Sequence, residues 1–173
     1  MELRAATPAD IPAIRAIYAH HVLHGLASFE TEPPSLAEMR SRFDSITAGG
    51  HPYLVAADGG DVLGYAYASV YRTRPGYRYT VEDSVYVSPA RVGHGIGRRL
   101  LATLIDESGR RGYRQMLAVI GDSANAASIR LHRACGFAPA GTLRSVGFKF
   151  GRWVDSVLMQ RGLGESDRSV PRP

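Results

Sequence analysis

The apolar positions of the first fifty residues recur at helical spacing in two segments. A short strand around Leu3 precedes the first segment, in which Thr7 can cap a helix and Gly25 can end it. The apolar face of this helix consists of Ile11, Ile14, Ile17 and Tyr18. A second helix is predicted from Ser35, which also suits a cap, to Gly49. The chain therefore begins with one strand and two helices.

The pattern changes to strands in the middle of the chain. Residues 53–72 contain two apolar, aromatic-rich runs joined by Asp-Gly-Gly-Asp, which is typical of a tight hairpin. After a loop at residues 73–76, residues 77–87 predict another strand. Short connections of this kind favour antiparallel pairing.

Helices and strands alternate in the second half of the chain. The expected helices cover residues 97–112 and 125–136, and the expected strands cover 113–120, 140–149 and 153–160. We therefore expect an α/β chain with a mixed (α+β) sheet. N-terminal antiparallel strands would be followed by a β-α-β-α-β half, with helices on both faces.

Length and composition indicate one soluble globular domain. The chain has 173 residues, and we expect the domain to span residues 1–163, with a flexible tail at 164–173 where apolar residues are scarce. Neither a run of about 18 apolar residues nor a basic and apolar leader is found, so we expect a cytoplasmic protein without a membrane partner. The single cysteine, Cys135, fits a reducing compartment.

The positive charge is spread along the chain. The formal net charge is +5, and adjacent arginines occur only at Arg98–Arg99 and Arg110–Arg111. A basic stripe interleaved with aromatic residues, as a nucleic-acid surface needs, is not visible. We therefore expect a small anionic ligand and no nucleic-acid partner; nucleic-acid binding, which would weaken steeply with salt, ranks last among the alternatives.

Three glycines, Gly93, Gly95 and Gly97, separate a strand-like run from a helix-like run. Glycines at the start of a helix let several backbone N–H groups approach an anion, and the helix dipole favours negative charge there. A dinucleotide fingerprint is excluded because the third glycine falls one place early, and a Walker loop because Gly-Lys-Ser/Thr is absent. A phosphate-binding loop and a simple tight turn both explain the segment.

Histidines and the cysteine do not form a metal motif. His20, His21 and His24 lie close in sequence, but adjacent histidines of a helix point apart and no carboxylate accompanies them. We expect them on the helix surface, and we expect no metal. Cys135 is expected to pack in the interior, although His132 three residues earlier leaves a covalent acetyl-cysteine route open.

Residues 87–101 resemble the pyrophosphate-binding segment of the GCN5-related N-acetyltransferase (GNAT) superfamily, Q/R-x-x-G-x-G/A. With Gly95 and Gly97 as the paired small residues, the usual Gln or Arg position falls on Val92, and Arg91 stands one place upstream. The expected side chain is missing, but backbone N–H groups can hold a pyrophosphate whatever the side chain is.

Residues 125–137 resemble the superfamily segment N-x-x-A-x-x-x-Y-x-x-x-G-F, with His132 in place of the tyrosine. Asn125, Ser128 and His132 are spaced i, i+3 and i+7, so they share one face of a helix. The resemblance implies a single-domain GNAT fold whose splayed central strands bind acetyl-CoA as a co-substrate. The cofactor-binding residues that we expect are Val85, Tyr86, Val87, Val92, Gly93, His94, Gly95, Ile96, Gly97, Arg98, Asn125 and Ser128.

From about residue 2 to 162, the chain resembles the phosphinothricin N-acetyltransferase branch, which includes enzymes acting on methionine sulfoximine and methionine sulfone. The agreement runs through "FETEPP", "YRTRPGYRYTVEDSVYVSP", "AVIG", "NAASIRLH" and "GTLRSVGFKFGRWVD". It implies that Glu82 is the general base, and homodimers are common among the relatives. The residues that it implies for binding a small amino-acid-like substrate are Phe29, Arg72, Arg74 and Tyr77.

These roles suit the acetylation of an amine. A substrate α-amine is mostly protonated at neutral pH, so Glu82 would take its proton before the amine attacks the thioester in a ternary complex. Arg72 and Arg74, two apart on an extended segment, are expected to point to one side and to hold carboxylate or phosphinate groups. An N–H near Val87 is expected to stabilise the oxyanion, and His132 to protonate the leaving thiolate.

Other interpretations of the same residues stay open. Glu82 beside Asp83 also fits an ordinary strand end, His132 fits a structural histidine, and the arginines fit solvated loop charges. A non-catalytic acyl-CoA-binding or sensing module, or an acetyltransferase for an unrelated amine, has the same motifs. The physiological acceptor depends on loops at residues 27–34 and 72–79, whose shape the spacing does not fix.

Overall fold

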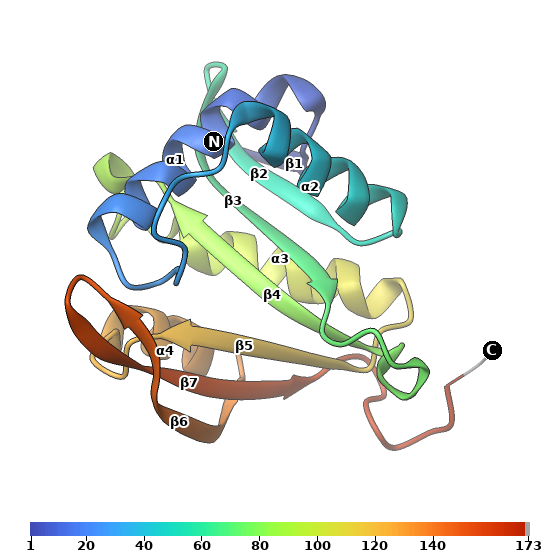
Figure 1. Cartoon of the computed structure of the whole chain (residues 1–173). Coiled ribbons are helices and arrows are strands. Elements are labelled where there is room, and N and C mark those ends of the chain that lie inside the picture. The colour runs from blue at the N-terminus through green and yellow to red at the C-terminus, as the bar shows by residue number, and fades with distance from the viewer. Residues whose placement is uncertain (172–173) are drawn as a thin grey trace.

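The computed structural model describes residues 1–171, which form a seven-stranded mixed sheet with two α-helices on each face (Figure 1). The strand order is β1-β2-β3-β4-β5-β7-β6, and only β4 and β5 are parallel within the described residues. This confirms the expected fold class. The elements are β1 (Glu2–Ala5), α1 (Ile11–His24), α2 (Leu36–Ala48), β2 (Tyr53–Asp58), β3 (Asp61–Val70), β4 (Thr80–Val87), α3 (Ile96–Arg110), β5 (Gln115–Gly121), α4 (Ala126–Ala134), β6 (Ala138–Lys149) and β7 (Arg152–Gly162).

Local sequence explains how the antiparallel half turns. Gly59 and Gly60 have φ angles of +56° and +96°, as a two-residue type I′ turn requires, and they close the β2–β3 hairpin. The next strand starts at Thr80, later than its apolar pattern indicated, because Pro75 begins a short 3-10 turn over Pro75–Tyr77. The connection between β3 and β4 is therefore a shaped loop of its own.

The central strands β4 and β5 diverge toward their carboxyl ends. Their parallel ladder joins Thr80 to Gln115 and ends at Asp83 and Ala118, although β4 runs on to Val87. On its other edge, β4 stays paired with β3 as far as Val87. Figure 1 shows the two arrows separating from right to left. The sheet therefore has a gap beside the second half of β4, which is the splay that the family resemblance implied.

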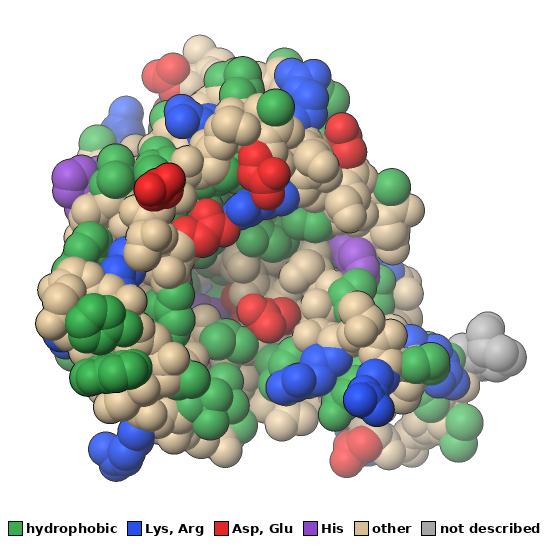
Figure 2. Space-filling view, in the orientation of Figure 1, with side chains coloured by type: hydrophobic (Ala, Val, Ile, Leu, Met, Phe, Trp, Pro, Cys, Tyr) green, Lys and Arg blue, Asp and Glu red, His purple; other side chains and the backbone are tan. Residues whose placement is uncertain are grey.

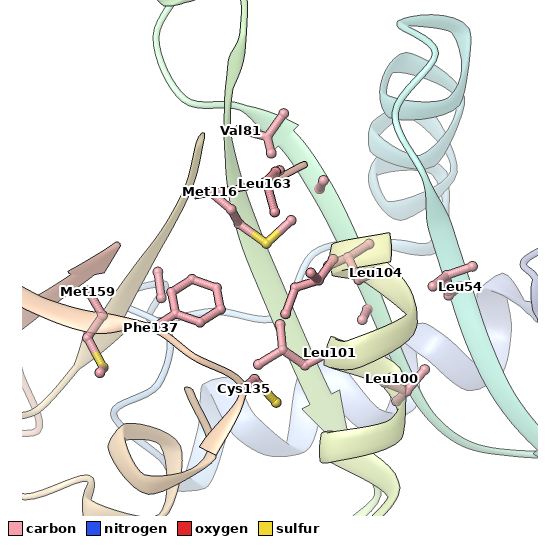
Figure 3. Packing of buried hydrophobic residues seen from close by; sticks show 14 of the residues in the cluster. Leu54, Val81, Leu100, Leu101, Leu104, Met116, Cys135, Phe137, Met159 and Leu163 are labelled. Atoms are coloured by element: carbon pink, nitrogen blue, oxygen red, sulfur yellow. The ribbon is translucent and has the colours of Figure 1, made fainter. Parts of the chain in front are cut away.

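Each face of the sheet carries its own hydrophobic core. On one face, Ile14 of α1 and Phe43 of α2 belong to a cluster with Tyr65 of β3. The other face is covered by α3 and α4 (Figure 3), and its cluster includes Leu100, Leu101, Leu104, Met116 and Phe137. Because strand side chains alternate, neighbouring residues of β4 point into opposite layers.

Two further expectations concern the flexible tail at residues 164–173 and the membrane-spanning segments. Ser166 and Ser169 accept hydrogen bonds from the side chains of Gln115 at 2.8 Å and Arg114 at 3.2 Å. Residues 172–173 of the expected flexible tail lie outside the described residues, and the flexibility stays a prediction. Within residues 1–171, the helices are too short or too polar to span a membrane.

Candidate active site

A pocket of about 330 Å³ opens beside the diverging end of β4. It brings together the end of β4, the glycine loop, the start of α3 and the first turns of α4. His94 does not line it, because its ring turns back so that Nδ1 lies 3.1 Å from the carbonyl oxygen of Val92. The residues predicted for cofactor binding that line it are Val85, Tyr86, Val87, Val92, Gly93, Gly95, Ile96, Gly97, Arg98, Asn125 and Ser128.

The glycine loop leads into a helix start that no side chain caps. Gly93 and Gly95 have φ angles of +87° and +76°, in the region that favours glycine. Within residues 1–171, no side chain caps α3, whereas Ser35 caps α2 and Asn125 caps α4. The first N–H groups of α3 have no intrahelical acceptor, and the helix dipole adds positive potential there. The glycine loop, the uncapped start of α3 and the side chain of Arg98 together form a wall of the pocket that fits a pyrophosphate.

The edge of β4 that faces the gap presents backbone N–H groups. Ser88 donates its N–H to the carbonyl of Leu63 at 2.9 Å, which makes them a hydrogen-bonded pair of the β3–β4 ladder. Such pairs alternate along an antiparallel ladder, so the N–H groups of Val85 and Val87 point away from β3. Since β5 no longer pairs with β4 there, these two groups face the pocket.

His21 reaches the same edge from α1, so the expectation that it lies on the helix surface is wrong. Its Nε2 lies 2.9 Å from the carbonyl oxygen of Val87 and donates, because a carbonyl only accepts. Burial lowers the pKa of His21 and outweighs the opposing hydrogen bond to Val87. His20 and His24 are exposed, and among residues 1–171 no three His, Cys, Asp or Glu side chains could hold a metal ion. Nothing in the sequence pattern singled out His21.

The pocket side of α4 carries Asn125, Ser128 and His132. Asn125 Oδ1 accepts the N–H of Ser128 at 3.1 Å and caps the helix. The ring of His132 is buried, with Nδ1 2.8 Å from the carbonyl oxygen of Ser128 and Nε2 3.0 Å from Oδ2 of Asp83. Burial by itself lowers the pKa of His132, but the hydrogen bond and charge of Asp83 raise it above its ordinary value.

Glu82 precedes Asp83 and points to the opposite face, toward α1 and α2. It lies opposite Ser69 of β3, is half-buried, and accepts no hydrogen bond from residues 1–171. Burial and the charge of Asp83 raise the pKa of Glu82, against the opposing charge of Arg72. Figure 2 shows a hollow on this face, with acidic side-chain atoms inside it. A free carboxylate of raised pKa has the properties of a general base.

Arg72, Arg74 and Tyr77 lie in the connection between β3 and β4, before the amino end of β4. The chain bends repeatedly between residues 71 and 74, so the alternation of an extended strand does not orient the two arginines. The Arg72 guanidinium lies 5.1 Å from the centre of the Tyr71 ring, and the Tyr77 ring meets that ring edge-on at 5.5 Å. Arg72 and Tyr77 are thus brought together at the surface around Tyr71, and Arg74 precedes the short turn that carries Tyr77.

Phe29 lies near the carboxyl end of β5, beside Gly121 and Gly147. A Cβ built on Gly147 of β6 would lie 2.5 Å from the Phe29 ring, and one on Gly121 would lie 3.2 Å from it. Gly121 ends β5, whereas Arg72 precedes β4, which runs parallel to β5. The structure therefore does not bring Phe29 into contact with the Arg72 region, and the two glycines make room for its ring.

A second pocket, of about 400 Å³, lies on the Glu82 side of the sheet between α2 and the strands β2 and β3. Ser69 lines it and pairs with Glu82 in the β3–β4 ladder, so the pocket borders the candidate base. Aromatic residues at alternate positions of residues 53–67 were the available signal, but the sequence did not show which helix would cover them. The larger side chains of its wall are Tyr18, Met39, Arg42, Tyr53, Tyr65 and Tyr67.

Known proteins are similar to this chain in sequence and in fold. The acetyltransferase (GNAT) family model matches residues 17–137. The chain is 55% identical over 169 residues to the phosphinothricin N-acetyltransferase of Alcaligenes faecalis, covering 98% of this chain and 86% of that one. It is 45% identical over 165 residues to the L-methionine sulfoximine/L-methionine sulfone acetyltransferase of Salmonella typhimurium, covering 95% and 96%. The crystal structure of a GNAT superfamily phosphinothricin acetyltransferase from Sinorhizobium meliloti in complex with AcCoA has a TM-score of 0.96 and 50% identity, covering 99% of this chain and 92% of that one. The chain therefore belongs to the acetyltransferase (GNAT) family.

Proposed function

We propose that the protein transfers the acetyl group of acetyl-CoA to the α-amine of a small amino acid or analogue of the phosphinothricin, methionine sulfoximine or methionine sulfone type. The observation that carries the proposal is Glu82, a carboxylate of raised pKa without a hydrogen-bond partner in residues 1–171, on the strand that also borders the cofactor pocket. The named activities of the two relatives support this class of acceptor.

Glu82 removes the proton that blocks the acceptor amine. An α-amino group has a pKa of about 8, so at neutral pH most of it is protonated and cannot attack a thioester. Burial and the charge of Asp83 raise the pKa of Glu82, which makes its carboxylate a better proton acceptor than a free glutamate. The neutral amine then attacks the acetyl carbonyl directly, within a ternary complex.

The loop between β3 and β4 positions the acceptor. Arg72 and Arg74 hold its carboxylate and side-chain anion, since a guanidinium donates two parallel hydrogen bonds to such groups. Tyr77 and Arg72 both contact the Tyr71 ring. Two guanidinium groups in this loop suit an amino acid with a second polar group on its side chain. Phe29 lies beside Gly121 and Gly147, away from this loop, and its contact with the acceptor stays a prediction.

Acetyl-CoA is assigned to the gap between β4 and β5. The pyrophosphate lies at residues 93–98, and the pantetheine arm follows Val85, Asn125 and Ser128. The N–H of Val87 stabilises the oxyanion that forms when the carbonyl is attacked. His132, on the α4 wall, supplies a proton to the thiolate that leaves.

Thiol release tests the proposal. Purified protein is mixed with acetyl-CoA and either phosphinothricin or methionine sulfoximine, and free thiol and N-acetylated product are measured. We expect thiol release that depends on the acceptor. Absence of release with a broad panel of amines, together with acetyl-CoA binding in calorimetry, would instead establish a non-catalytic acyl-CoA sensor. Release with other amines only would establish an unrelated acceptor.

We also propose that two copies pair through the β6–β7 hairpin. Figure 2 shows hydrophobic side chains gathered over this hairpin at the lower left. Contiguous apolar surface of this kind is uncommon on monomers. Analytical ultracentrifugation of the wild type should show a dimer. Trp153→Glu should dissociate this dimer, whereas the control Leu23→Glu, on α1, should leave it intact. A monomeric wild type would contradict the proposal. The large hydrophobic residues of the hairpin that are at least 50% exposed are Leu143, Val146, Phe148, Phe150 and Trp153.

We propose a cytoplasmic location without nucleic-acid or membrane partners. The support is the free thiol of Cys135 and the scattered positive charge. Fractionation of cells that express the protein checks the location. Tight DNA binding that weakens steeply with salt would contradict the absence of a nucleic-acid partner.

A further inference from the structure

Asp83 and His132 form a buried contact that joins β4 to α4. His132 Nε2 lies 3.0 Å from Asp83 Oδ2, and the two side chains are 6% and 1% exposed. Asp83 is the last residue of β4 that pairs with β5, opposite Ala118, and α4 follows β5 in the chain. The contact therefore links the two parts of the sheet at the point where the β4–β5 ladder ends.

The geometry places a proton between the two side chains. Nδ1 of His132 lies 2.8 Å from the carbonyl oxygen of Ser128 and must carry a hydrogen, because a carbonyl only accepts. If Nε2 carried none, its lone pair would face an oxygen of a carboxylate, and two acceptors repel each other. Loss of the shared proton would also leave an uncompensated negative charge in a buried site. The pair therefore holds one proton in the Nε2–Oδ2 bridge.

The pair borders a pocket of about 50 Å³ where the strands diverge. Asp83 Oδ1 is buried and has no hydrogen-bond partner within residues 1–171. A buried acceptor without a partner is costly, so a hydrogen donated by a ligand would be stabilising there. The residues that this pocket shares with the cofactor pocket include Val85, Tyr86, Asn125 and Ser128.

We propose that Asp83 is a positioning residue for His132: the two side chains hold one proton between them, and His132 passes it to the sulfur of CoA when the acetyl group leaves. This rests on the proposed acetyl transfer. The neutral amine nitrogen bonds to the acetyl carbon, the carbon–sulfur bond breaks with its electron pair on sulfur, and the shared proton forms the S–H bond. The nitrogen, which gains a positive charge when it bonds to carbon, loses one of its two protons to water and becomes the amide nitrogen. The pair is left with one negative charge and regains a proton from water after the product departs.

The groups around His132 keep the proton on the ring. Burial alone favours the neutral imidazole, but the hydrogen bond and charge of Asp83 and the carbonyl of Ser128 raise the pKa of His132. Within residues 1–171, only Asp83 places a carboxylate in contact with the ring. The other titratable, charged or aromatic groups near the pair are Glu82 on the opposite face of β4, Cys135 at the end of α4, Arg98 of α3 and Arg161 of β7 near Cys135, and Phe137, whose ring meets the imidazole edge-on.

Nitrogen-15 NMR of the imidazole tests the shared proton without any turnover. At pH 7 we expect both ring nitrogens of His132 to be protonated in the folded protein. The ring should lose its proton at a higher pH than the same histidine in urea-unfolded protein. A neutral His132 at pH 7, or titration at the pH of the unfolded chain, would overturn the proposal. Because this measurement uses the wild-type chain, it decides the matter even if substitutions at the buried pair prevent folding.

Asp83→Asn tests whether the charge of Asp83 matters. The substitution keeps the shape of the side chain but removes its charge. Burial is then opposed only by the carbonyl of Ser128, so the ring should lose its proton at a lower pH than in the wild type. We expect kcat at alkaline pH to fall roughly tenfold, with the KM for acetyl-CoA unchanged. The alkaline limb of kcat should move to lower pH in step with the NMR titration, which a merely structural role would not cause.

A double-mutant cycle shows whether Asp83 acts through His132. His132→Asn should lower kcat by roughly 10², and adding Asp83→Asn should lower it no further. Additive losses, or an unmoved alkaline limb in Asp83→Asn, would overturn the proposal. If NMR finds the shared proton but no amine is acetylated, the transfer to sulfur falls together with the proposed function, and only the proton-holding pair stands.

Discussion

Glu82 and Asp83 are neighbours in the sequence, yet the sheet places them in two different environments. Glu82 is half-buried, lies opposite Ser69 of the pocket beneath α2, and has no hydrogen-bond partner within residues 1–171. Asp83 is buried on the other face and bound to His132 of α4. Successive side chains of a strand point to opposite faces of the sheet. One face of β4 therefore carries Glu82, which can accept a proton, and the other face carries the Asp83–His132 pair, which already holds one.

The two faces of the sheet also offer different groups to a ligand: backbone groups on the face of the proposed cofactor site, and side chains on the face of Glu82. On the cofactor side, the pocket offers backbone N–H groups of Val85 and Val87 and the uncapped start of α3. On the acceptor side, the walls are tyrosine and arginine side chains. Backbone groups stay the same when side chains change, whereas a wall of side chains changes with every substitution. Variation on the acceptor face should therefore alter which amine is used, and leave the use of CoA intact.

The largest effect that we predict is the loss of the base. Glu82→Gln keeps the size of the side chain but cannot take a proton, so kcat should fall by about 10²- to 10⁴-fold. The dissociation constant for acetyl-CoA should stay the same, because the proposed cofactor site lies along the edge of β4 toward the gap and Glu82 does not line that pocket. Steady-state kinetics and calorimetry measure the two quantities.

A matched control for this substitution is Glu107→Gln on α3, where the carboxylate pairs with Arg110 at the surface. We expect it to leave kcat unchanged. Turnover that survives in Glu82→Gln would remove the proposed base, and an equal loss of acetyl-CoA binding would mean that the two faces are not separate.

The next effect concerns the backbone of the cofactor side. Gly95→Ala puts a side chain at a φ of +76°, which costs about 1 to 2 kcal/mol and shifts the start of α3. We expect the KM for acetyl-CoA to rise roughly tenfold, with the KM for the acceptor unchanged. Gly112→Ala, at a φ of +89° in the loop after α3, is the matched control. It should lower stability by a similar amount without changing either KM, and a similar KM defect in both variants would count against a special role for the loop.

Local signals in the sequence predicted most of this frame. Asp-Gly-Gly-Asp predicted the β2–β3 hairpin, and the glycines before α3 predicted a helix start whose backbone N–H groups can approach an anion. The structure adds that Gly93 and Gly95 have positive φ angles and that no side chain caps this helix within residues 1–171. The splay of the central strands was expected from the family resemblance rather than from the pattern of residues, and only the structure shows that it begins after Asp83. The hairpin and the helix start each depend on a short stretch of chain, which is why a single sequence suffices to predict them.

Contacts between distant segments could not be predicted in the same way. His21 and Val87 are 66 positions apart, and Asp83 and His132 are 49 positions apart, so no spacing rule connects them. The position of Phe29 depends on two glycines of other strands. Such contacts arise from how helices pack on the sheet, and only the folded chain shows them.

The pH dependence sharpens the comparison of the two carboxylates. Because Glu82 must be ionised to act and its pKa is raised, kcat/KM should fall with decreasing pH already above the usual range of a glutamate. The charge of Asp83 contributes to that rise, so Asp83→Asn should move this acid limb to lower pH. Asp58→Asn, at an exposed contact with the N-terminus, should leave it in place. An acid limb unchanged by Asp83→Asn would mean that the two faces are not coupled electrostatically.

The smallest effect that we predict comes from Arg72, whose positive charge opposes the rise in the pKa of Glu82. In Arg72→Gln this opposition is gone, so the acid limb should move to higher pH, and kcat/KM at low pH, divided by its plateau value, should fall about twofold. The ratio removes any change in acceptor binding that the substitution also causes. Arg72 is exposed, and at about 0.1 M salt charges are screened over about 10 Å. Raising the salt concentration should therefore bring the wild type toward the variant and leave the variant unchanged. If neither the salt concentration nor the substitution moved the acid limb of kcat/KM, burial and Asp83 alone would set the proton affinity of Glu82. Arg72 would then act on the acceptor only.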